Sequence, residues 1–424
     1  MGSYILSDYS LFETFDSIFA LFVSLLSEGW ILKTIAFVIM AGSIMALLEK
    51  SGGVNGFVHY VLEKKSLVTS PRSALMLSYI LGLIIFVETS MTALISGAVG
   101  KPLCERYKIP RAKLAFVCDS TAAPLGSLIV FNGYGALLLG LITTQISLGY
   151  IDANATEVLI DALLHNFYAI LALFMTFLFI YFSFDIGAMK YATFTPSKKE
   201  QTQLLTSSMF YMIAPMVLMI VLVFVFLYIT GEGNILKGSG SSAIFYTMLS
   251  TLLFTFFYYI FTKNMTPKVW LITAFKGAKS FIAISFLLVF AFALGDVTGD
   301  LHTGEYLASL ASHNVAPYLL GGLIFLLSAL ISFSTGTSWG TFSIMIPIAV
   351  PMAFAMDAEI ALVIGAVVSG GIFGDHCSPI SDTTIISSMA ADCELIEHVK
   401  TQLPYALISG SLAFILFIVF ALVS

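Results

Sequence analysis

Long apolar stretches recur along this chain, and they limit its fold more than any other feature of the sequence. Of its 424 residues, 58% are hydrophobic and only 10% are charged, whereas about a quarter of the residues of a typical soluble protein are charged. Segments of about 20 apolar residues alternate with short polar loops, which is typical of membrane-spanning helices and not of the alternating strands of a barrel. The sequence therefore predicts an all-α polytopic membrane protein.

The apolar segments define the expected spans. Crossing helices are predicted at 29–48, 111–145, 163–184, 208–230, 242–262, 279–295, 358–389 and 403–422. Residues 12–27 are apolar but short, and two interpretations, an interfacial helix or a ninth span, stay open. Segments 53–66 and 300–312 are polar enough to lie along the membrane surface.

Two further stretches do not fit a single span. In 73–104, two apolar runs flank the polar residues 88–92, and in 316–356 similar runs flank 334–341. As a helix, each run of about 15 residues is about 24 Å long, which is short of an apolar core of about 30 Å. Both stretches are predicted to be re-entrant helical hairpins whose polar tips are buried or line a cavity. A single long, kinked helix is the alternative.

Basic residues distinguish the two hairpins. Lys and Arg occur at both ends of the first hairpin and at neither end of the second. Since cytoplasmic loops carry the excess of Lys and Arg, the first pair of ends is expected inside and the second outside. Residues near Arg106 and Lys198 are therefore predicted to be cytoplasmic, and residues near Asn154 and His302 extracellular.

The two halves of the chain follow one plan in opposite orientations. Each hairpin precedes a span in which an acid, Asp119 or Asp375, is followed by a proline. Inverted repeats with broken helices are the architecture of secondary transporters, which bind substrate at the repeat interface. The predicted units are an N-terminal interfacial segment (1–28), a first repeat (29–184) with a broken helix at 111–145, a cytoplasmic loop and linking helices (185–278), and a second repeat (279–424) with a broken helix at 358–389.

Acids within apolar helices are costly and therefore point to function. Near a helix break, carboxylate, hydroxyl and freed carbonyl oxygens together suit Na⁺. The predicted ion or substrate ligands are Asp119, Ser120, Thr121, Thr337, Ser338, Asp375, Ser378, Asp382 and Thr383, with Asp119, Asp375 and Asp382 as the Na⁺ ligands. The alternative is that these groups cap broken helices and bind no ion.

Two residues are candidates for proton coupling. Glu88 lies among apolar residues at the first hairpin tip, which favours its neutral form and predicts proton exchange near neutral pH. A permanently protonated or capping Glu88 is the alternative. His376 can also titrate. The alternative is that it only forms a hydrogen bond with Asp375 or with the backbone. Further along, Asp392, Glu394, Glu397 and His398 are predicted to form a solvated cytoplasmic face.

Enzyme and pump signatures are absent from the sequence. There is no P-loop, HExxH or dinucleotide-binding turn, and the four cysteines lack CxxC spacing. These observations argue against an enzyme or a primary pump. We expect no cofactor and no nucleic-acid partner; the expected partners are membrane lipid, Na⁺ and H⁺.

Several motifs resemble one known family. GDHCSPISDTT at 374–384, followed by HVKTQLPYA at 398–406, resembles the NhaC-type Na⁺/H⁺ antiporter family. RAKLAFVCDSTAAP at 111–124 and STGTSWGT at 334–341 are similar to that family's first-half motif and second hairpin. The resemblance implies electrochemically coupled transport by an ion-transporter-type fold in the bacterial cytoplasmic membrane. By analogy with such folds, it also implies a homodimer.

The leading hypothesis is Na⁺/H⁺ exchange by alternating access. The alternative is a Na⁺- or H⁺-coupled carrier of an amino acid or small carboxylate. An anionic substrate usually needs a basic residue at mid-membrane, and the arginines, Arg72, Arg106 and Arg111, all lie at the predicted cytoplasmic edge. Their position favours a cation. The alternative stays open, because the N-terminus of a hairpin helix can also hold a carboxylate.

Overall fold

The computed structural model describes residues 10–53, 56–57, 59–60, 68–84, 89–130, 132–196, 207–235, 238–282, isolated positions between 285 and 309, and 316–423. Within these ranges every regular element is a helix. Among the described residues, eight helical segments are long and apolar enough to cross a membrane. The predicted all-α, multi-pass architecture is therefore confirmed.

The helices mostly follow the predicted segments. In chain order they are α2 (Leu11–Ser27), α3 (Gly29–Lys50), α5 (Pro71–Ile84), α6 (Thr89–Tyr107), α7 (Arg111–Gly126), α8 (Gly133–Ser147), α9 (Ala155–Leu164), α10 (Phe167–Phe182), η2 (Gly187–Tyr191), α11 (Phe210–Thr230), α12 (Gly240–Phe261), α13 (Pro267–Ser280), η4 (Pro317–Leu319), α16 (Leu320–Thr335), α17 (Ser338–Ala355), α18 (Ile360–Cys377), α19 (Asp382–Ala391) and α20 (Leu395–Val423). Within the predicted span at 279–295, residues 283, 284, 287, 288, 291, 294 and 295 lie outside the described residues.

Two helices differ from the prediction because polar residues begin a new helix. The predicted span at 163–184 starts only at Phe167, where the Asn166 side chain accepts a hydrogen bond from the Ala169 N–H, and α9 precedes it as a separate helix. Helix α13 was not predicted. It starts at Pro267, after Thr266 accepts a hydrogen bond from the Val269 N–H, and proline is well suited to a first helical turn.

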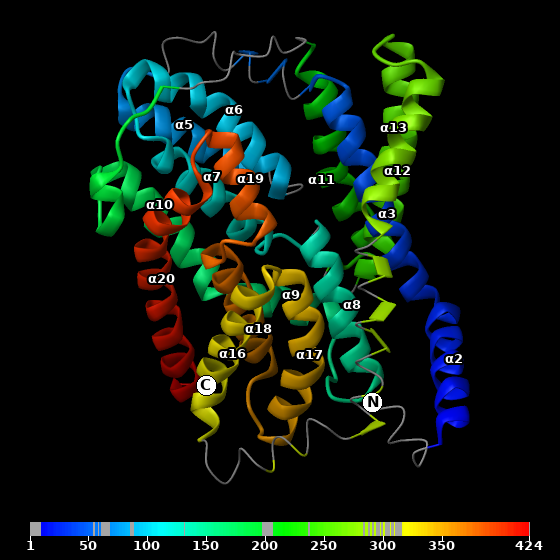
Figure 1. Ribbon diagram of the computed structural model, residues 1–424. Coiled ribbons are helices and arrows are strands. Elements are labelled where there is room, and N and C mark those ends of the chain that lie inside the picture. The colour runs from blue at the N-terminus through cyan, green and yellow to red at the C-terminus, as the bar shows by residue number, and fades with distance from the viewer. Residues whose placement is uncertain are drawn as a thin grey trace.

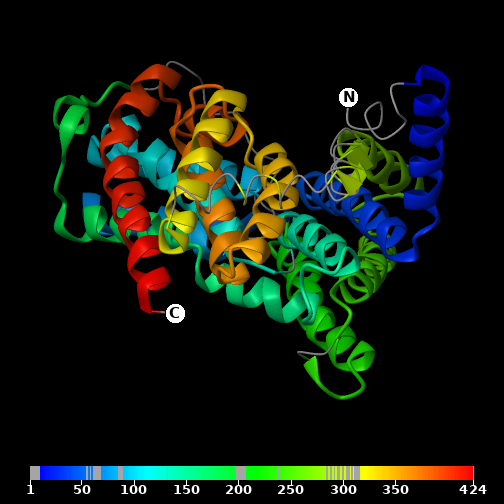
Figure 2. The same ribbon diagram turned by 90° about the horizontal axis from the view of Figure 1, so that it is seen from below.

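The helices form two groups that lie side by side (Figures 1 and 2). One group contains α2, α3, α11, α12 and α13, and the other contains α5, α6, α7, α10 and α16–α20. Helix α8 lies between them and packs on α3 and α12 on one side and on α17 on the other. In the first group, α3 and α13 cross at Gly42 and Gly277. The two helices can approach closely there because neither residue has a Cβ, for which the crossing has no room.

Both of the predicted broken helices are divided into two helical segments. One break separates α7 from α8, and the Asn132 side chain caps α8 by accepting a hydrogen bond from the Gly135 N–H. The other separates α18 from α19, which Ser381 caps in the same way through the Thr384 N–H. Figure 1 shows α7 and α19 in the upper half of the molecule and α8 and α18 in the lower half. Helix α7 packs on both α19 and α18, so the two breaks come together.

The predicted hairpins correspond to the helix pairs α5–α6 and α16–α17, and the two helices of each pair pack on each other. In the second pair, Gly336 at φ +66° ends α16 and Thr337 caps α17. A left-handed backbone of this kind favours glycine. In the first pair, residues 85–88, with Glu88, lie outside the described residues, and the rest of the polar tip begins α6. The pairs occupy opposite ends of the molecule (Figure 1), as the charge pattern predicts. The re-entrant turns and the inverted repeat stay predictions.

Labelling from one side of the membrane tests this topology. Cysteines are introduced at Arg106 and at Asp152, both exposed, in a background in which the partly exposed Cys393 is changed to serine. In intact cells an impermeant maleimide is expected to label Asp152→Cys, and to label Arg106→Cys only after permeabilisation, because basic loops stay in the cytoplasm. Labelling of both positions in intact cells would contradict the predicted crossing of the membrane between them.

Candidate functional site

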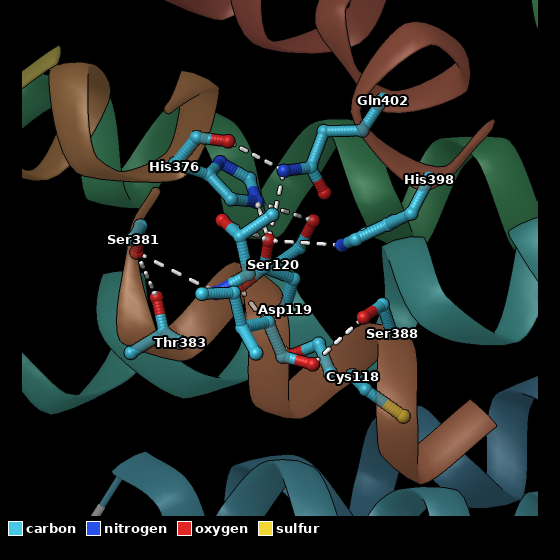
Figure 3. Close-up of polar contacts among 12 residues, drawn as sticks. Cys118, Asp119, Ser120, His376, Ser381, Thr383, Ser388, His398 and Gln402 are labelled. Carbon is cyan, nitrogen blue, oxygen red and sulfur yellow. Dashed lines mark hydrogen bonds and ion pairs between the residues drawn. The ribbon is translucent and has the colours of Figure 1, made fainter. Parts of the chain in front are cut away.

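Asp119 lies at the centre of a buried polar network (Figure 3). Its side chain on α7 is fully buried and faces α19 and α20. The Oδ2 atom lies 2.8 Å from Gln402 Nε2, 3.2 Å from His398 Nε2 and 3.2 Å from the Thr384 hydroxyl, and Oδ1 accepts from Ser387 at 3.4 Å. Hydrogen bonds of this kind compensate a buried carboxylate, since each is stronger when one partner is charged.

His376 extends this network to α18 and α10. Its ring is buried, with Nδ1 2.7 Å from the Tyr168 hydroxyl and Nε2 3.3 Å from the Ser120 hydroxyl. The same Nε2 lies 3.9 Å from Asp119 Oδ2, and Gln402 Nε2 donates to the His376 carbonyl. His376 is therefore linked to Asp119, whereas the alternative to a titrating role in the sequence analysis was a hydrogen bond to Asp375 or to the backbone.

Asp375 has a contrasting environment. Its side chain in the last turn of α18 is 1% exposed. The Oδ2 atom accepts one long hydrogen bond, at 3.5 Å, from the Ser338 hydroxyl, and that hydroxyl also contacts Tyr134 at 2.9 Å. Among the described residues Oδ1 has no hydrogen-bond partner. A buried polar atom without a partner is unfavourable and calls for an explanation such as a bound ion.

Several other predicted ligands make local contacts. Their hydroxyls bond within or between helix ends: Thr121 to the Val117 carbonyl, Ser378 to the Phe333 carbonyl, Thr337 to the Gly340 N–H, and Thr383 to the Ser381 hydroxyl. Asp382 is exposed and accepts from the Thr383 N–H at 2.8 Å. These groups make hydrogen bonds within helices and at helix ends, and their role as ion ligands stays a prediction.

The three acids predicted as Na⁺ ligands do not form one compact cluster. Within the part of the chain that the structure describes, no group of three or more His, Cys, Asp or Glu side chains is arranged to hold a single metal ion. Asp382 and Asp119 are nevertheless close enough to Asp375 for their charges to repel its own. The two buried acids thus have different surroundings: Asp119 has four hydrogen-bonding partners, whereas Asp375 has one long hydrogen bond from Ser338 and the Ser381 hydroxyl nearby.

Sequence reasoning missed three residues around Asp119, namely Ser387, His398 and Gln402. His398 was predicted to be solvated and is fully buried, because the face of α20 that carries it packs on α7 and α19. Gln402 lies four residues later and so shares that face. Thr384 and Ser387 are three residues apart on α19 and also share one helix face. A polar pair with helical spacing in an apolar segment was the signal available in the sequence.

Comparisons with known proteins agree with this architecture. The model of the Na⁺/H⁺ antiporter family matches residues 133–422. An uncharacterized protein of Haemophilus influenzae is 34% identical over 437 aligned residues, which cover 96% of this chain and 82% of the relative. An uncharacterized Na⁺/H⁺ antiporter of the same organism is 39% identical over 108 residues, 26% of this chain and 23% of the relative.

A solved structure supports the fold. MtrF of Neisseria gonorrhoeae, described as illuminating a class of antimetabolite efflux pumps, aligns with a TM-score of 0.66 at 15% identity. The alignment covers 99% of this chain and 86% of MtrF. Together with the family match over more than half of the chain and the apolar helices long enough to cross a membrane, the comparisons establish a multi-pass secondary transporter that belongs to the Na⁺/H⁺ antiporter family.

Proposed function

We propose that this protein exchanges Na⁺ for H⁺ by alternating access and that the two ions compete for Asp375. The observation that supports this proposal is the buried Asp375 carboxyl, whose Oδ1 has no partner among the described residues. An ionised carboxylate without compensation costs several kcal/mol in such surroundings. Either a bound Na⁺ or a proton removes this cost. The site is therefore expected to close only when one of the two ions occupies it, which makes the exchange obligatory.

The surroundings of Asp375 suit a small cation. The carboxyl lies in the last turn of α18, where the partial negative charge of the helix end favours positive charge. The Ser338 hydroxyl already lies beside it, and the end of a helix leaves backbone carbonyls without intrahelical partners. In known transporters, unwound carbonyls and the C-terminal ends of half-helices coordinate coupling ions.

Basic residues near the site would instead indicate an anionic substrate. In the described ranges, neither Arg nor Lys contacts Asp119 or Asp375. Arg111 is buried but pairs with Glu105 and donates to the Lys101 carbonyl at the start of α7, and Arg72 and Arg106 are exposed. This distribution favours a cation over an amino acid or carboxylate as the transported species.

Asp119 would have a different role in this mechanism. Gln402, His398 and Thr384 already surround one of its oxygens and Ser387 the other. Na⁺ could reach this carboxylate only if at least one of these donors moved away. We therefore assign Asp119 to holding α7, α19 and α20 together around the ion site. Glu88, outside the described residues, stays a predicted second proton carrier.

Competition between the ions leads to a kinetic prediction. Because a ligand must lose its proton before it binds a metal ion, the apparent KM for Na⁺ should rise as the pH falls, by up to about tenfold per pH unit for one-to-one competition. The maximal rate should stay constant. Dequenching of a pH-sensitive dye in proteoliposomes, titrated with Na⁺ at a series of pH values, measures both quantities.

The same assay tests the choice of substrate. Na⁺ is expected to collapse the pH gradient, whereas K⁺, amino acids and carboxylates alone are not. A maximal rate that falls with pH at constant KM would contradict competition at one carboxyl. Exchange that requires an added amino or carboxylic acid would contradict the Na⁺/H⁺ assignment and support the carrier alternative.

A further inference from the structure

A cavity of about 240 Å³ lies apart from the ion site. It opens where the start of α5, the α6–α7 loop, the start of α7 and the end of α10 meet. The charge pattern places these ends at the cytoplasmic surface. The charged residues that line it are Arg72, Lys108, Lys113 and Asp185. Lys113 pairs with Asp185 at 2.8 Å. Two positive charges therefore have no compensating acid in the cavity.

These two cations are Arg72 and Lys108. The Arg72 guanidinium lies 5.8 Å from the centre of the Tyr181 ring, and its Nε donates to the Ser183 hydroxyl at 3.4 Å. Lys108 has a left-handed backbone, φ +53°, in the loop between α6 and α7. Among the residues that the structure describes, no acid forms an ion pair with either of them. Both are exposed and available to an anion.

The rest of the cavity is apolar. Leu75, Ile109, Phe179 and Ile180 are buried residues that line it. Next to it on α10, Tyr181 is 50% exposed and Phe182 is 63% exposed. Exposed aromatic side chains at the end of a span are typical of the membrane–water interface. The cavity thus combines a basic rim with an apolar wall at the depth of lipid headgroups.

We propose that this cavity binds the headgroup of an anionic phospholipid, with the phosphate between Arg72 and Lys108. The planar guanidinium of arginine suits bidentate binding of a phosphate, and lysine adds a point charge. Basic pockets between membrane helices on the cytoplasmic side are a recurrent way of binding such headgroups. The apolar wall favours a lipid over free phosphate, which would gain nothing from it. The bound lipid would connect α5, α7 and α10.

Lipid titration tests the proposal. The full chain is purified into zwitterionic nanodiscs, and the binding of short-chain phosphatidylglycerol is measured by native mass spectrometry. The double variant Arg72→Gln/Lys108→Asn removes both charges, and asparagine tolerates the left-handed backbone at Lys108. Since each basic residue at a membrane surface contributes about 1 kcal/mol, the double variant is expected to bind about 30-fold more weakly.

Two controls distinguish this site from general effects. Lys190→Gln removes an exposed charge from η2, which is predicted to be cytoplasmic but does not line the cavity, and it should leave the affinity unchanged. Inorganic phosphate and glycerol phosphate should not compete with the lipid. An unchanged affinity in the double variant, an equal loss in Lys190→Gln, or competition by the soluble phosphates at the lipid's own concentration would each overturn the proposal. An unchanged melting temperature shows that the variants fold.

Discussion

Asp375→Asn is expected to abolish Na⁺-driven proton movement. Asparagine keeps the size of the side chain and one oxygen, but it cannot carry the negative charge or the exchangeable proton. Removing a charge from a buried charge pair costs at least about 3 kcal/mol, which corresponds to a loss of at least about 100-fold in Na⁺ affinity. Calorimetric titration of the purified variant with Na⁺ measures the affinity, and dye dequenching in proteoliposomes measures transport.

A matched substitution controls for the loss of an acid. Asp152→Asn makes the same chemical change on an exposed loop, and Glu394→Gln removes an exposed acid beside α20. Both variants should transport Na⁺ at close to the normal rate. Na⁺ affinity at the wild-type level in Asp375→Asn would show that the end of α18 is structural and that the ion binds elsewhere.

The stability of Asp375→Asn should not fall in parallel with its activity. The wild-type carboxyl is buried, and its Oδ1 has no hydrogen-bond partner among the described residues. Replacing an undercompensated buried charge by a neutral group is often neutral or stabilising. Without Na⁺ the variant is therefore expected to melt at the same temperature as the wild type or at a higher one, and Na⁺ should stabilise only the wild type.

Asp119→Asn is expected to lose both transport and stability. The amide oxygen can keep the place of Oδ2 while the NH2 group turns toward the Ser387 hydroxyl, but the charge that strengthens the hydrogen bonds with Gln402 and His398 would be lost. Breaking a buried charged interaction by removing one partner costs about 3–5 kcal/mol. Thermal unfolding of the purified protein should show a clear decrease, in contrast to Asp375→Asn.

A milder substitution in the same network provides the control. Thr384→Val removes one hydroxyl donor to Asp119 but keeps the shape of the side chain and the carboxylate. It is expected to lower the free energy of unfolding by only about 1 kcal/mol. If Asp119→Asn proved as stable as the wild type, the network would not be what holds α7, α19 and α20 together, and Asp119 would become a candidate for direct ion binding.

Local features of the sequence were sufficient to predict the class of the protein and much of its helical pattern. Apolar segments of spanning length have few alternatives in a bilayer, where the backbone must satisfy its own hydrogen bonds. The break between α18 and α19 was predictable from Pro379, whereas Pro124, where the first break was expected, lies inside α7, and that helix ends only at Gly126. The family could be inferred as well, because the motif around Asp375 is contiguous.

The tertiary structure alone decided which groups surround each acid. The Asp119 carboxylate meets Thr384 and Gln402, which are 265 and 283 residues away in the chain. His398 was predicted to face solvent and is buried, whereas Asp382, predicted to bind Na⁺, is exposed. The hydropathy of α19 and α20 indicates that they lie in the membrane, but the face that each turns toward α7 depends on packing against neighbours. For that reason the contrast between the saturated Asp119 and the undercompensated Asp375 cannot be obtained from the sequence.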